Sequence, residues 1–555
     1  MASLVGSDHS RIVALSVILI LGATMRLYGV TSRGIYDYDE AWFLLEAKSI
    51  YNSGRYVAAQ AGLRDDADVS LGLREYVKKR GTVPLTSIKP GHRALILAGM
   101  LALGPYDYAG IVVSALGGLA TILLVYLVGR RLFGTTAGIF AALCLAVSPL
   151  HIHYSRSVYA QSNVLCWAAL GLWLWVRLHT AGDRRPSRLI APGIAIGWAF
   201  TCHFNTVWLP VGLLFLDALV LRFDRPGRPW IANALRRGLV LGISMASPLL
   251  LFDLAGRALK LLGAFPADYP TYLGQFLKRE SQAQALELSL DQVPFWSGRL
   301  LQTEGPLLIL LAVLGIVLAA RGIRTRDTGT IVVIGLLTVA LVPPSLLNVR
   351  GLFILRNYAL ALIPLSMLAG VAASRLCDYV GRSVRLGPQA GYLLAAAIAV
   401  AGVLGSWDLL TTHSSYRAAT HRLAAYIKDN GGAVATLPRS AWPLWYFYLS
   451  EAYDTASDEV RGRIRFYPES ANDGDYELFD TKRYYRAVLQ HNHLEVERID
   501  RIRTTGKTAV RVPNPAADLP FRFQEAGGRP AEEALVEMKS RFPAYNTIEV
   551  VDLRM

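Results

Sequence analysis

Charged residues are scarce in this sequence, and cysteines are scarcer still. Of its 555 residues only 18% are charged, whereas soluble domains carry about 25%, and 53% are hydrophobic. This balance excludes an ordinary soluble domain and indicates a protein that crosses a membrane several times. Neither a disulfide framework nor a metal-binding spacing is present, because all four cysteines lie inside or at the edge of apolar runs: Cys144, Cys166, Cys202 and Cys377.

Motifs that would define a chemistry are also missing. There is no Walker loop, zinc motif, nucleophile elbow or dinucleotide fingerprint, and no internal repeat. The net charge of +15 does not indicate nucleic-acid binding, because most arginines and lysines before residue 400 lie in short loops between apolar runs. We therefore expect a lipid bilayer, and no nucleic acid, as a partner. The first apolar run lacks a well-placed cleavage site, which favours a retained helix over a signal peptide.

Long apolar runs are what the sequence does have. Roughly eleven of them are long enough to cross the hydrocarbon core as helices. They lie at about 11–30, 108–129, 134–150, 161–178, 189–204, 206–222, 238–255, 304–320, 329–347, 351–374 and 389–407. A further run at 94–103, stopped by Gly104-Pro105, is too short to span and is interpreted as re-entrant or interfacial.

The loops between these runs predict the orientation and the domains. Arginine-rich loops alternate with nearly bare ones, which places the N-terminus inside. The fold class expected is mainly α: a polytopic helical membrane domain at 1–407, followed by a soluble α/β domain at 408–555 on the outer face. Two long segments, 31–107 and 256–303, then form outer loops.

The soluble region opens with a recognisable helix and strand. A helix is expected at Tyr416–Lys428, ended by Asn430-Gly431-Gly432 and followed by a short strand at 433–437. Beyond it, several aromatic residues could stack on sugar rings, although such a stripe more often belongs to a core. They are Trp442, Trp445, Tyr446 and Tyr448.

Three carboxylates follow directly on the first apolar run, in the stretch Gly34-Ile35-Tyr36-Asp37-Tyr38-Asp39-Glu40. An amphipathic helix is expected next, from Trp42 to Tyr51, ending at Asn52-Ser53-Gly54. Acidic groups at a membrane edge are costly unless they cap, pair or react. Asp39 is therefore interpreted as the N-cap of that helix, as a general base facing a lipid-borne substrate, or as both. Asp37, Asp39 and Glu40 could also hold a divalent cation, although no second set of ligands is evident.

Cations recur in the outer segments, where the positive-inside rule predicts few lysines and arginines. They form three groups: Lys89, His92 and Arg93; Arg156; and Arg350 with Arg356, beside Tyr358. The first and third groups are either interfacial side chains or ligands of a phosphate. Arg156 is alone in a short turn, so an acid or a phosphate is expected to pair with it. Acids in one outer loop and cations in three others are the arrangement needed to hold a phosphate beside a carboxylate.

Other polar residues in or near apolar runs have two interpretations. His203, Asp217 and Asp253 could be functional or could be buried and satisfied within the protein. His151 and His153 do not share a helix face at their spacing, which disfavours a metal pair.

Four features, in this order, resemble the GT-C superfamily of membrane glycosyltransferases. They are Asp39-Glu40 after the first span, Lys89-Pro90 late in the first outer loop, Ser148-Pro149 with Tyr154-Ser155-Arg156, and Tyr358 six residues before Pro364. The nearest resemblance is to the branch of protein O-mannosyltransferases and lipid A aminoarabinose transferases, and it covers about the first 375 residues. The chain departs from the usual pattern of that branch at Gly91, Gln161 and Asn357.

The resemblance implies an enzyme that moves a sugar from a polyprenyl-phosphate carrier to an acceptor hydroxyl on the outer face, with inversion. Asp39 would act as the general base, and Glu40 would orient it or a cation. The phosphate of the donor would be bound by cations and stabilised by a tyrosine hydroxyl as it leaves. The residues assigned to it are Lys89, His92, Arg93, Arg156, Arg356 and Tyr358.

The acceptor is left open by the sequence: a glycan, a lipid or a protein would each supply a hydroxyl. The arginine-rich composition favours a bacterial inner membrane. Two other functions remain as alternatives. One is a transporter of a lipid-linked sugar, although the absence of repeated halves disfavours it. The other is a non-catalytic relative that binds glycans or partners, which the departure at Gln161 keeps open.

Overall fold

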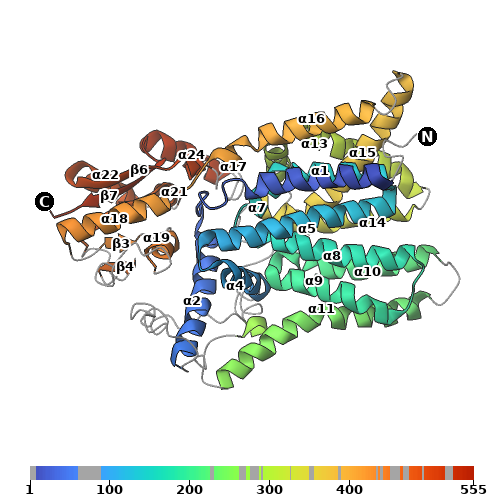
Figure 1. Ribbon diagram of the computed structural model, residues 1–555, viewed down its shortest axis with the longest axis horizontal. Coiled ribbons are helices and arrows are strands. Elements are labelled where there is room, and N and C mark those ends of the chain that lie inside the picture. Colours follow the sequence, from blue (N-terminus) through green and yellow to red (C-terminus); the bar gives the residue numbers. More distant parts are fainter. Residues whose placement is uncertain are drawn as a thin grey trace. The chain divides into compact units, whose positions relative to one another are not determined.

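A computed structural model gives the arrangement of most of the chain (Figure 1). The residues it describes are 8–60, 89–224, 230–261, 271–274, 287–288, 292–324, 327–348, 355–384, 389–432, 435–437, 442–450, 463–466, 474–489, 493–518 and 529–554. They fall into two compact units. The helical unit comprises 1–28, 86–92 and 114–410, and the sheet unit comprises 29–85, 93–113 and 411–555.

The helical unit consists of helices with a minor two-stranded pairing. Its α-helices are α1 (Asp8–Leu27), α6 (Thr135–Ala146), α7 (Pro149–Ser155), α8 (Gln161–Thr180), α9 (Ile190–Cys202), α10 (Trp208–Asp224), α11 (Trp230–Leu261), α13 (Gln292–Arg324), α14 (Thr328–Leu346), α15 (Leu362–Ser383) and α16 (Gln389–Gly405). Short 3-10 turns are η1 (Pro186–Leu189), η2 (Phe204–Thr206) and η3 (Leu355–Ala361). Strands β1 (Glu287–Leu288) and β2 (Leu347–Asn348) pair antiparallel. Three helices, α4 (Pro90–Leu103), α5 (Asp107–Phe133) and α17 (Trp407–Thr411), contain residues of both units.

Six helices in the described part of the chain are long and apolar enough to cross a membrane, or up to eight if each of two bent pairs forms one span. The chain is therefore a multi-pass membrane protein. Fewer helices meet this test than the eleven runs expected, partly because α9 and α10 have only 13 and 17 residues. The number of spans and their orientation remain predictions.

The helices of this unit pack closely. In Figure 1, α8, α9, α10 and α11 run side by side, and α8 packs on α9, which packs on α11. The other face of α11 keeps large apolar side chains exposed, as a surface in contact with lipid would. These side chains are Leu235, Leu239, Ile243 and Leu254.

The sheet unit contains a five-stranded mixed sheet in the order β4-β3-β5-β7-β6. The strands are β3 (Ala435–Leu437), β4 (Ile464–Phe466), β5 (Tyr476–Phe479), β6 (Lys507–Pro513) and β7 (Thr547–Asp552). β3 is parallel to β4 and β5, whereas β7 is antiparallel to β5 and β6. The helices are α2 (Tyr38–Gln60), α18 (Tyr416–Asn430), α19 (Trp442–Leu449), α21 (Thr481–Leu489), α22 (His493–Thr505) and α24 (Arg529–Arg541), with the 3-10 turn η5 (Pro515–Asp518).

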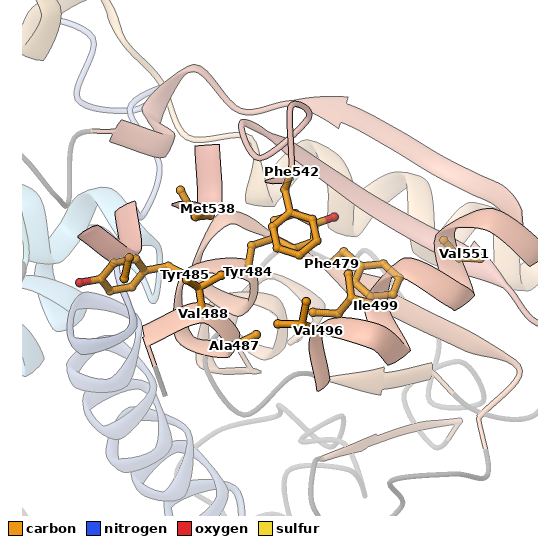
Figure 2. Close-up of a cluster of buried hydrophobic side chains, with 11 residues drawn as sticks. Phe479, Tyr484, Tyr485, Ala487, Val488, Val496, Ile499, Met538, Phe542 and Val551 are labelled. Carbon is orange, nitrogen blue, oxygen red and sulfur yellow. The ribbon is translucent and has the colours of Figure 1, made fainter. Parts of the chain in front are cut away.

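The core of the sheet is aromatic on one side (Figure 2). Tyr484 of α21 stacks on Phe542 with ring centroids 4.6 Å apart, and it is also parallel to Phe479 of β5. Val496 and Ile499 of α22 and Met538 of α24 complete this buried cluster. A small domain of this kind, with helices on a mixed sheet, confirms the α/β character expected of the C-terminal region.

Two local predictions can be compared with these boundaries. The helix expected at Tyr416–Lys428 is confirmed as α18, and it ends at Gly431 and Gly432, which both have positive φ. The helix expected at Trp42–Tyr51 is wrong in its end, because α2 continues through Asn52-Ser53-Gly54 to Gln60. Asn52 is buried there, and packing of a helix outweighs the weak local preference of such residues for a stop.

Candidate functional site

The acidic stretch forms the start of α2, and its carboxylates have different partners. Asp37 is the N-cap: its backbone oxygen accepts the first helical hydrogen bond from Ala41, and its side chain accepts the amide of Asp39 at 3.2 Å. Glu40, three residues on, accepts the amides of Asp37 and Tyr36 at 3.2 and 2.8 Å. This reciprocal pattern is a capping box, with Asp in the place that Ser or Thr usually takes.

Glu40 also neutralises a buried arginine. Its other carboxylate oxygen lies 3.1 Å from the Arg33 guanidinium, and both side chains are almost fully buried. Arg33 in turn donates to the carbonyl of Gly34 and lies over the ring of Tyr36, 3.8 Å from its centroid. Glu40 therefore orients a cation and closes the turn, which makes it a structural residue.

Asp39 is the second residue of α2, and its amide donates to the cap. Its side chain is partly exposed, in contrast to those of Asp37 and Glu40. The interpretation of Asp39 as the N-cap is therefore wrong, because α2 begins at Tyr38 and Asp37, two residues earlier, takes that role. A carboxylate in the first turn is stabilised as the anion by the helix dipole.

The three acids do not form a cluster for a metal ion. Glu40 has its oxygens committed to Arg33 and to two amides. Within the described ranges, no group of three or more His, Cys, Asp or Glu side chains could hold a metal.

Lys89 and the start of α4 are shaped by two unusual backbone features. Lys89 is the one residue other than glycine with a positive φ, 56°, among those described, and Pro90 follows at the first helical position. The side chain of Lys89 is mostly buried. Gly91 packs against Thr201 of α9 so closely that an added Cβ would overlap its hydroxyl. This contact explains why the chain has Gly91 where the resembling family usually has proline.

His92 and Arg93 are buried and bound to other parts of the protein. Nε2 of His92 lies 2.9 Å from the carbonyl of Val158, and Nδ1 lies 3.0 Å from the side-chain amide of Asn163. These two contacts tie the ring to the segment that leads into α8 and to α8 itself. In the sheet unit, Arg93 forms an ion pair with Glu46 of α2.

Arg156 is fully buried and binds the end of a helix. Its guanidinium donates to the carbonyls of Met25, Arg26 and Tyr28 at 3.2, 3.4 and 2.7 Å. These carbonyls belong to the last turn of α1, where unsatisfied oxygens and the helix dipole attract a cation. A helix C-terminus thus compensates part of this buried charge, and the acid or phosphate expected to pair with Arg156 stays a prediction.

Arg26 is a comparable residue that the sequence reasoning missed. It donates to Ala146 at the end of α6 at 2.9 Å, and its guanidinium lies 2.6 Å from Nδ1 of His151. The signal was available, since an arginine inside the first apolar run requires buried partners.

Ser148, the N-cap of α7, accepts the amide of His151, and Pro149 occupies the first helical position.

Arg356 and Tyr358 lie in a polar and aromatic region of the helical unit. The Arg356 guanidinium is 5.8 Å from the ring centroid of Tyr159, and Tyr358 stacks on Trp296 at 5.4 Å. The hydroxyl of Tyr358 donates to the carbonyl of Pro344 at 3.3 Å. Arg350 lies outside the described residues. A carboxylate that the sequence did not single out, Glu304 of α13, accepts the amide of Leu150 at the start of α7.

The remaining candidates have structural partners. Asp217 accepts hydrogen bonds from Trp175, His179 and Arg237 inside the bundle, and Asp253 pairs with Arg257. Trp445 and Tyr448 are fully buried, and Trp445 lies edge-on to Tyr416 of α18. A sugar platform at these two rings is therefore excluded, and the side chain of Trp442 is outside the described part.

Comparison with known proteins supplies the class. The fold is similar to that of ArnT from Cupriavidus metallidurans bound to undecaprenyl phosphate, with 16% identity and a TM-score of 0.56 over 86% of this chain and 94% of that one. The apo state of the same protein gives 0.54, with the same identity and coverage. The oligosaccharyltransferase of Archaeoglobus fulgidus, in complex with zinc and sulfate, gives 0.50 at 12% identity over 86% of this chain and 69% of that one. No curated protein matches the sequence.

These likenesses show that the chain shares its fold with ArnT. Residues 89–252 match the family model described as Dolichyl-phosphate-mannose-protein mannosyltransferase. The resemblance seen in the sequence is therefore confirmed, and so is the enzyme class: a glycosyltransferase family that uses sugars on dolichyl or polyprenyl phosphate.

Proposed function

We propose that this chain transfers a sugar from a polyprenyl-phosphate donor to an acceptor hydroxyl, with inversion at the anomeric carbon and with Asp39 as the general base. The acceptor is a glycan, a lipid or a protein, and the reaction takes place on the extracytoplasmic face of a bacterial inner membrane. The family match supports the donor class, and the fold it shares with a protein bound to undecaprenyl phosphate agrees with it.

The reaction needs one base and no general acid. The acceptor oxygen forms a bond to the anomeric carbon while the bond from that carbon to the phosphate oxygen breaks. The hydroxyl proton passes to the carboxylate of Asp39, and the polyprenyl phosphate leaves with the bonding electron pair as an anion. Because the leaving group is already an acidic phosphate, cations and hydrogen-bond donors stabilise it, whereas a glycoside hydrolase requires a second carboxyl group.

The observation that carries the proposal is the division of labour among the acids of the turn. Asp37 caps α2 and Glu40 binds Arg33 and two amides, so both carboxylates stabilise the start of the helix. Asp39 lies between them at the same helix start, and its side chain is partly exposed where those of Asp37 and Glu40 are buried. A base needs this combination of a fixed position and access to solvent or substrate.

The donor phosphate is assigned to basic residues and a tyrosine. We assign to it, as a set, Lys89, His92, Arg93, Arg156, Arg356 and Tyr358, because cations with a neighbouring hydroxyl suit a phosphate. His92, Arg93 and Arg156 also have protein partners, so they would contribute in addition by holding α4 and the end of α1 in place.

The test is transfer from a panel of radiolabelled polyprenyl-phosphate sugars by the purified full-length protein in lipid nanodiscs. Asp39→Asn should lower turnover by about 10²- to 10⁴-fold, which is the range a general base contributes, and should leave donor binding within a few-fold of the wild type. Asp183→Asn is the matched control, because Asp183 pairs with two exposed arginines of a loop, Arg185 and Arg188, and should keep full turnover.

The outcomes separate the rival functions. Turnover that Asp39→Asn leaves intact would overturn the assignment of the base. A donor that both forms bind but neither consumes would favour the non-catalytic relative. Passage of the intact lipid-linked sugar across a vesicle membrane, without transfer, would favour a transporter.

A further inference from the structure

The sheet unit contains a buried carboxylate that the proposed reaction does not use. Asp107, the first residue of α5, is fully buried. One nitrogen of the Arg417 guanidinium lies 2.7 and 2.6 Å from its two oxygens, and the hydroxyl of Tyr448 donates to it at 2.8 Å. The amide of Tyr108 donates to it as well, at 2.8 Å. We call Asp107, Arg417 and Tyr448 the anchor.

The anchor is bound directly to the turn that leads to Asp39. The hydroxyl oxygen of Tyr448 accepts the amide of Ile35 at 2.9 Å, and the second terminal nitrogen of Arg417 donates to the carbonyl of Thr31 at 3.1 Å. The direction of these bonds is fixed. Tyr448 has one hydroxyl proton, which it gives to Asp107, so its oxygen is the acceptor for Ile35.

Neighbouring residues of the C-terminal region hold the same turn. The amide of Ser414 donates to the carbonyl of Arg33 at 2.8 Å, and the hydroxyl of Tyr36 donates to the carbonyl of Thr412 at 2.7 Å. Gly34 has a φ of 73°, and an added Cβ would lie 3.1 Å from the Cβ of Ser414 and 3.4 Å from the hydroxyl of Tyr448. The backbone of residues 31–36 is thus fixed from one side along its length.

Helix α2 is held by the same element that supplies Tyr448. Helix α19 packs on α2, and Lys48 of α2 lies 4.7 Å from the ring centroid of Phe447 and is hydrogen-bonded to Ser450. The turn before Asp39 and the helix after it therefore have a common support in the C-terminal region.

We propose that the anchor is a positioning device for catalysis: Tyr448, with Asp107 and Arg417, sets the place of the general base by fixing the turn at Ile35. This inference rests on the proposed function of Asp39. It assigns a role to the C-terminal region, which contributes positioning residues to the reaction without touching the substrate. Displacement of a reacting group by about 1 Å can cost on the order of 100-fold in rate. Loss of the anchor should therefore lower kcat much more than it changes the binding of the donor.

Tyr448→Phe is the first test, because it keeps the ring and removes both hydrogen bonds. In full-length protein we expect kcat to fall by about 10- to 100-fold, with the KM for the donor within twofold of the wild type. Hydrogen exchange at the Ile35 amide, followed by mass spectrometry of peptides covering 29–40, should become faster. Tyr426→Phe is the matched control: it also removes a tyrosine hydroxyl that donates to an aspartate, Asp552 at 3.2 Å, and should change neither quantity.

Arg417→Lys tests the charged part of the anchor. A lysine keeps the charge but cannot bind both Asp107 and Thr31 in the same way, so kcat should fall and exchange at residues 29–40 should rise. Arg422→Lys is its control: Arg422 lies on the same helix, is exposed and donates to the backbone carbonyl of Arg511. The pH at which kcat is half-maximal should be the same as in the wild type. The variant moves the carboxylate of the base but does not change its affinity for a proton.

Failure of this inference can be told apart from failure of the proposed function. If Asp39→Asn abolishes transfer while Tyr448→Phe and Arg417→Lys turn over normally, the anchor has no positioning role. A uniform rise of exchange over the whole sheet unit, with kcat and KM changed together, would also overturn it in favour of a merely stabilising role. If Asp39→Asn is active, the base is wrongly assigned, and faster exchange confined to 29–40 would still support the anchor as the holder of this turn.

Discussion

At the scale of single residues, position in a helix start separates acids that look alike in sequence. Asp37 and Asp39 are two residues apart, yet Asp37 is buried as the N-cap of α2 whereas Asp39 is partly exposed in the first turn. The spacing Asp37-x-x-Glu40 is the signature of a capping box, so this part of the site was readable from the sequence. The partners of Arg156 were not, because the carbonyls at the end of α1 come together with it only in the folded chain.

Glu40→Gln should destabilise the protein strongly, although it preserves an oxygen for the amides of the cap. The variant leaves the buried guanidinium of Arg33 without its counter-charge, and removing one partner of a buried pair costs roughly 3–5 kcal/mol. Thermal unfolding in detergent, followed by tryptophan fluorescence, measures the loss.

Asp39→Asn is the control for this experiment, since it removes a partly exposed charge near a helix start and should cost about 1 kcal/mol or less. The double variant Arg33→Met/Glu40→Gln should recover part of the loss, because no buried charge remains. Equal unfolding temperatures for Glu40→Gln and Asp39→Asn would show that the pair does not stabilise the turn.

At the scale of elements, the sequence predicted the helices and their ends unequally. The double glycine at the end of α18 stops the helix because both residues adopt a positive φ. Asn52-Ser53-Gly54 looks similar but does not stop α2, since its context in the folded unit is helical. Local composition determines a helix end only where no packing opposes it.

Two glycine-to-alanine changes should therefore have opposite effects. Gly34→Ala forces a left-handed backbone on a residue with a side chain, which costs about 1–2 kcal/mol, and adds a Cβ against Ser414. Gly54→Ala replaces an exposed glycine inside α2, with no neighbour near its Cβ, and should stabilise by up to about 1 kcal/mol.

Thermal unfolding of the two variants beside the wild type measures the direction of each change in stability. The transfer assay then compares their kcat values. Gly34→Ala should also lower kcat, because it moves the turn on which Asp39 depends, whereas Gly54→Ala should leave kcat unchanged. Unchanged or higher stability of Gly34→Ala would mean that the turn at Gly34 relaxes without strain, and lower stability of Gly54→Ala would contradict the second prediction.

At the scale of the whole molecule, the class of enzyme could be predicted from the sequence. The contacts between the C-terminal region and the turn before Asp39 could not. Apolar runs and the order of a few motifs indicated a GT-C membrane glycosyltransferase, because these signals are local and each is carried by neighbouring residues. The C-terminal region showed no motif, since its contribution is made of single contacts over long sequence separations. Arg417 and Thr31, for example, are 386 residues apart.

In the proposed function, Arg356 serves the binding of the donor and Tyr448 serves the positioning of the base. A pair of variants can test whether these are separate steps. Arg356→Ala removes a cation assigned to the donor phosphate, so the KM for the donor should rise by about 10- to 100-fold, as expected for a hydrogen bond to a charged group. Tyr448→Phe should instead lower kcat with little change in KM. Because one variant weakens a binding step and the other misplaces the base, their effects on kcat/KM should multiply in the double variant.

Initial rates over a range of donor concentrations, for the wild type, both single variants and the double variant, provide the measurement. Tyr426→Phe combined with Arg356→Ala is the control pair and should behave as Arg356→Ala alone. A double variant no worse than the poorer single variant would mean that Arg356 and Tyr448 act on the same step, since residues that act as a unit are not additive. Tyr448 would then contribute to donor binding, and the anchor would hold the donor's site as well as the base.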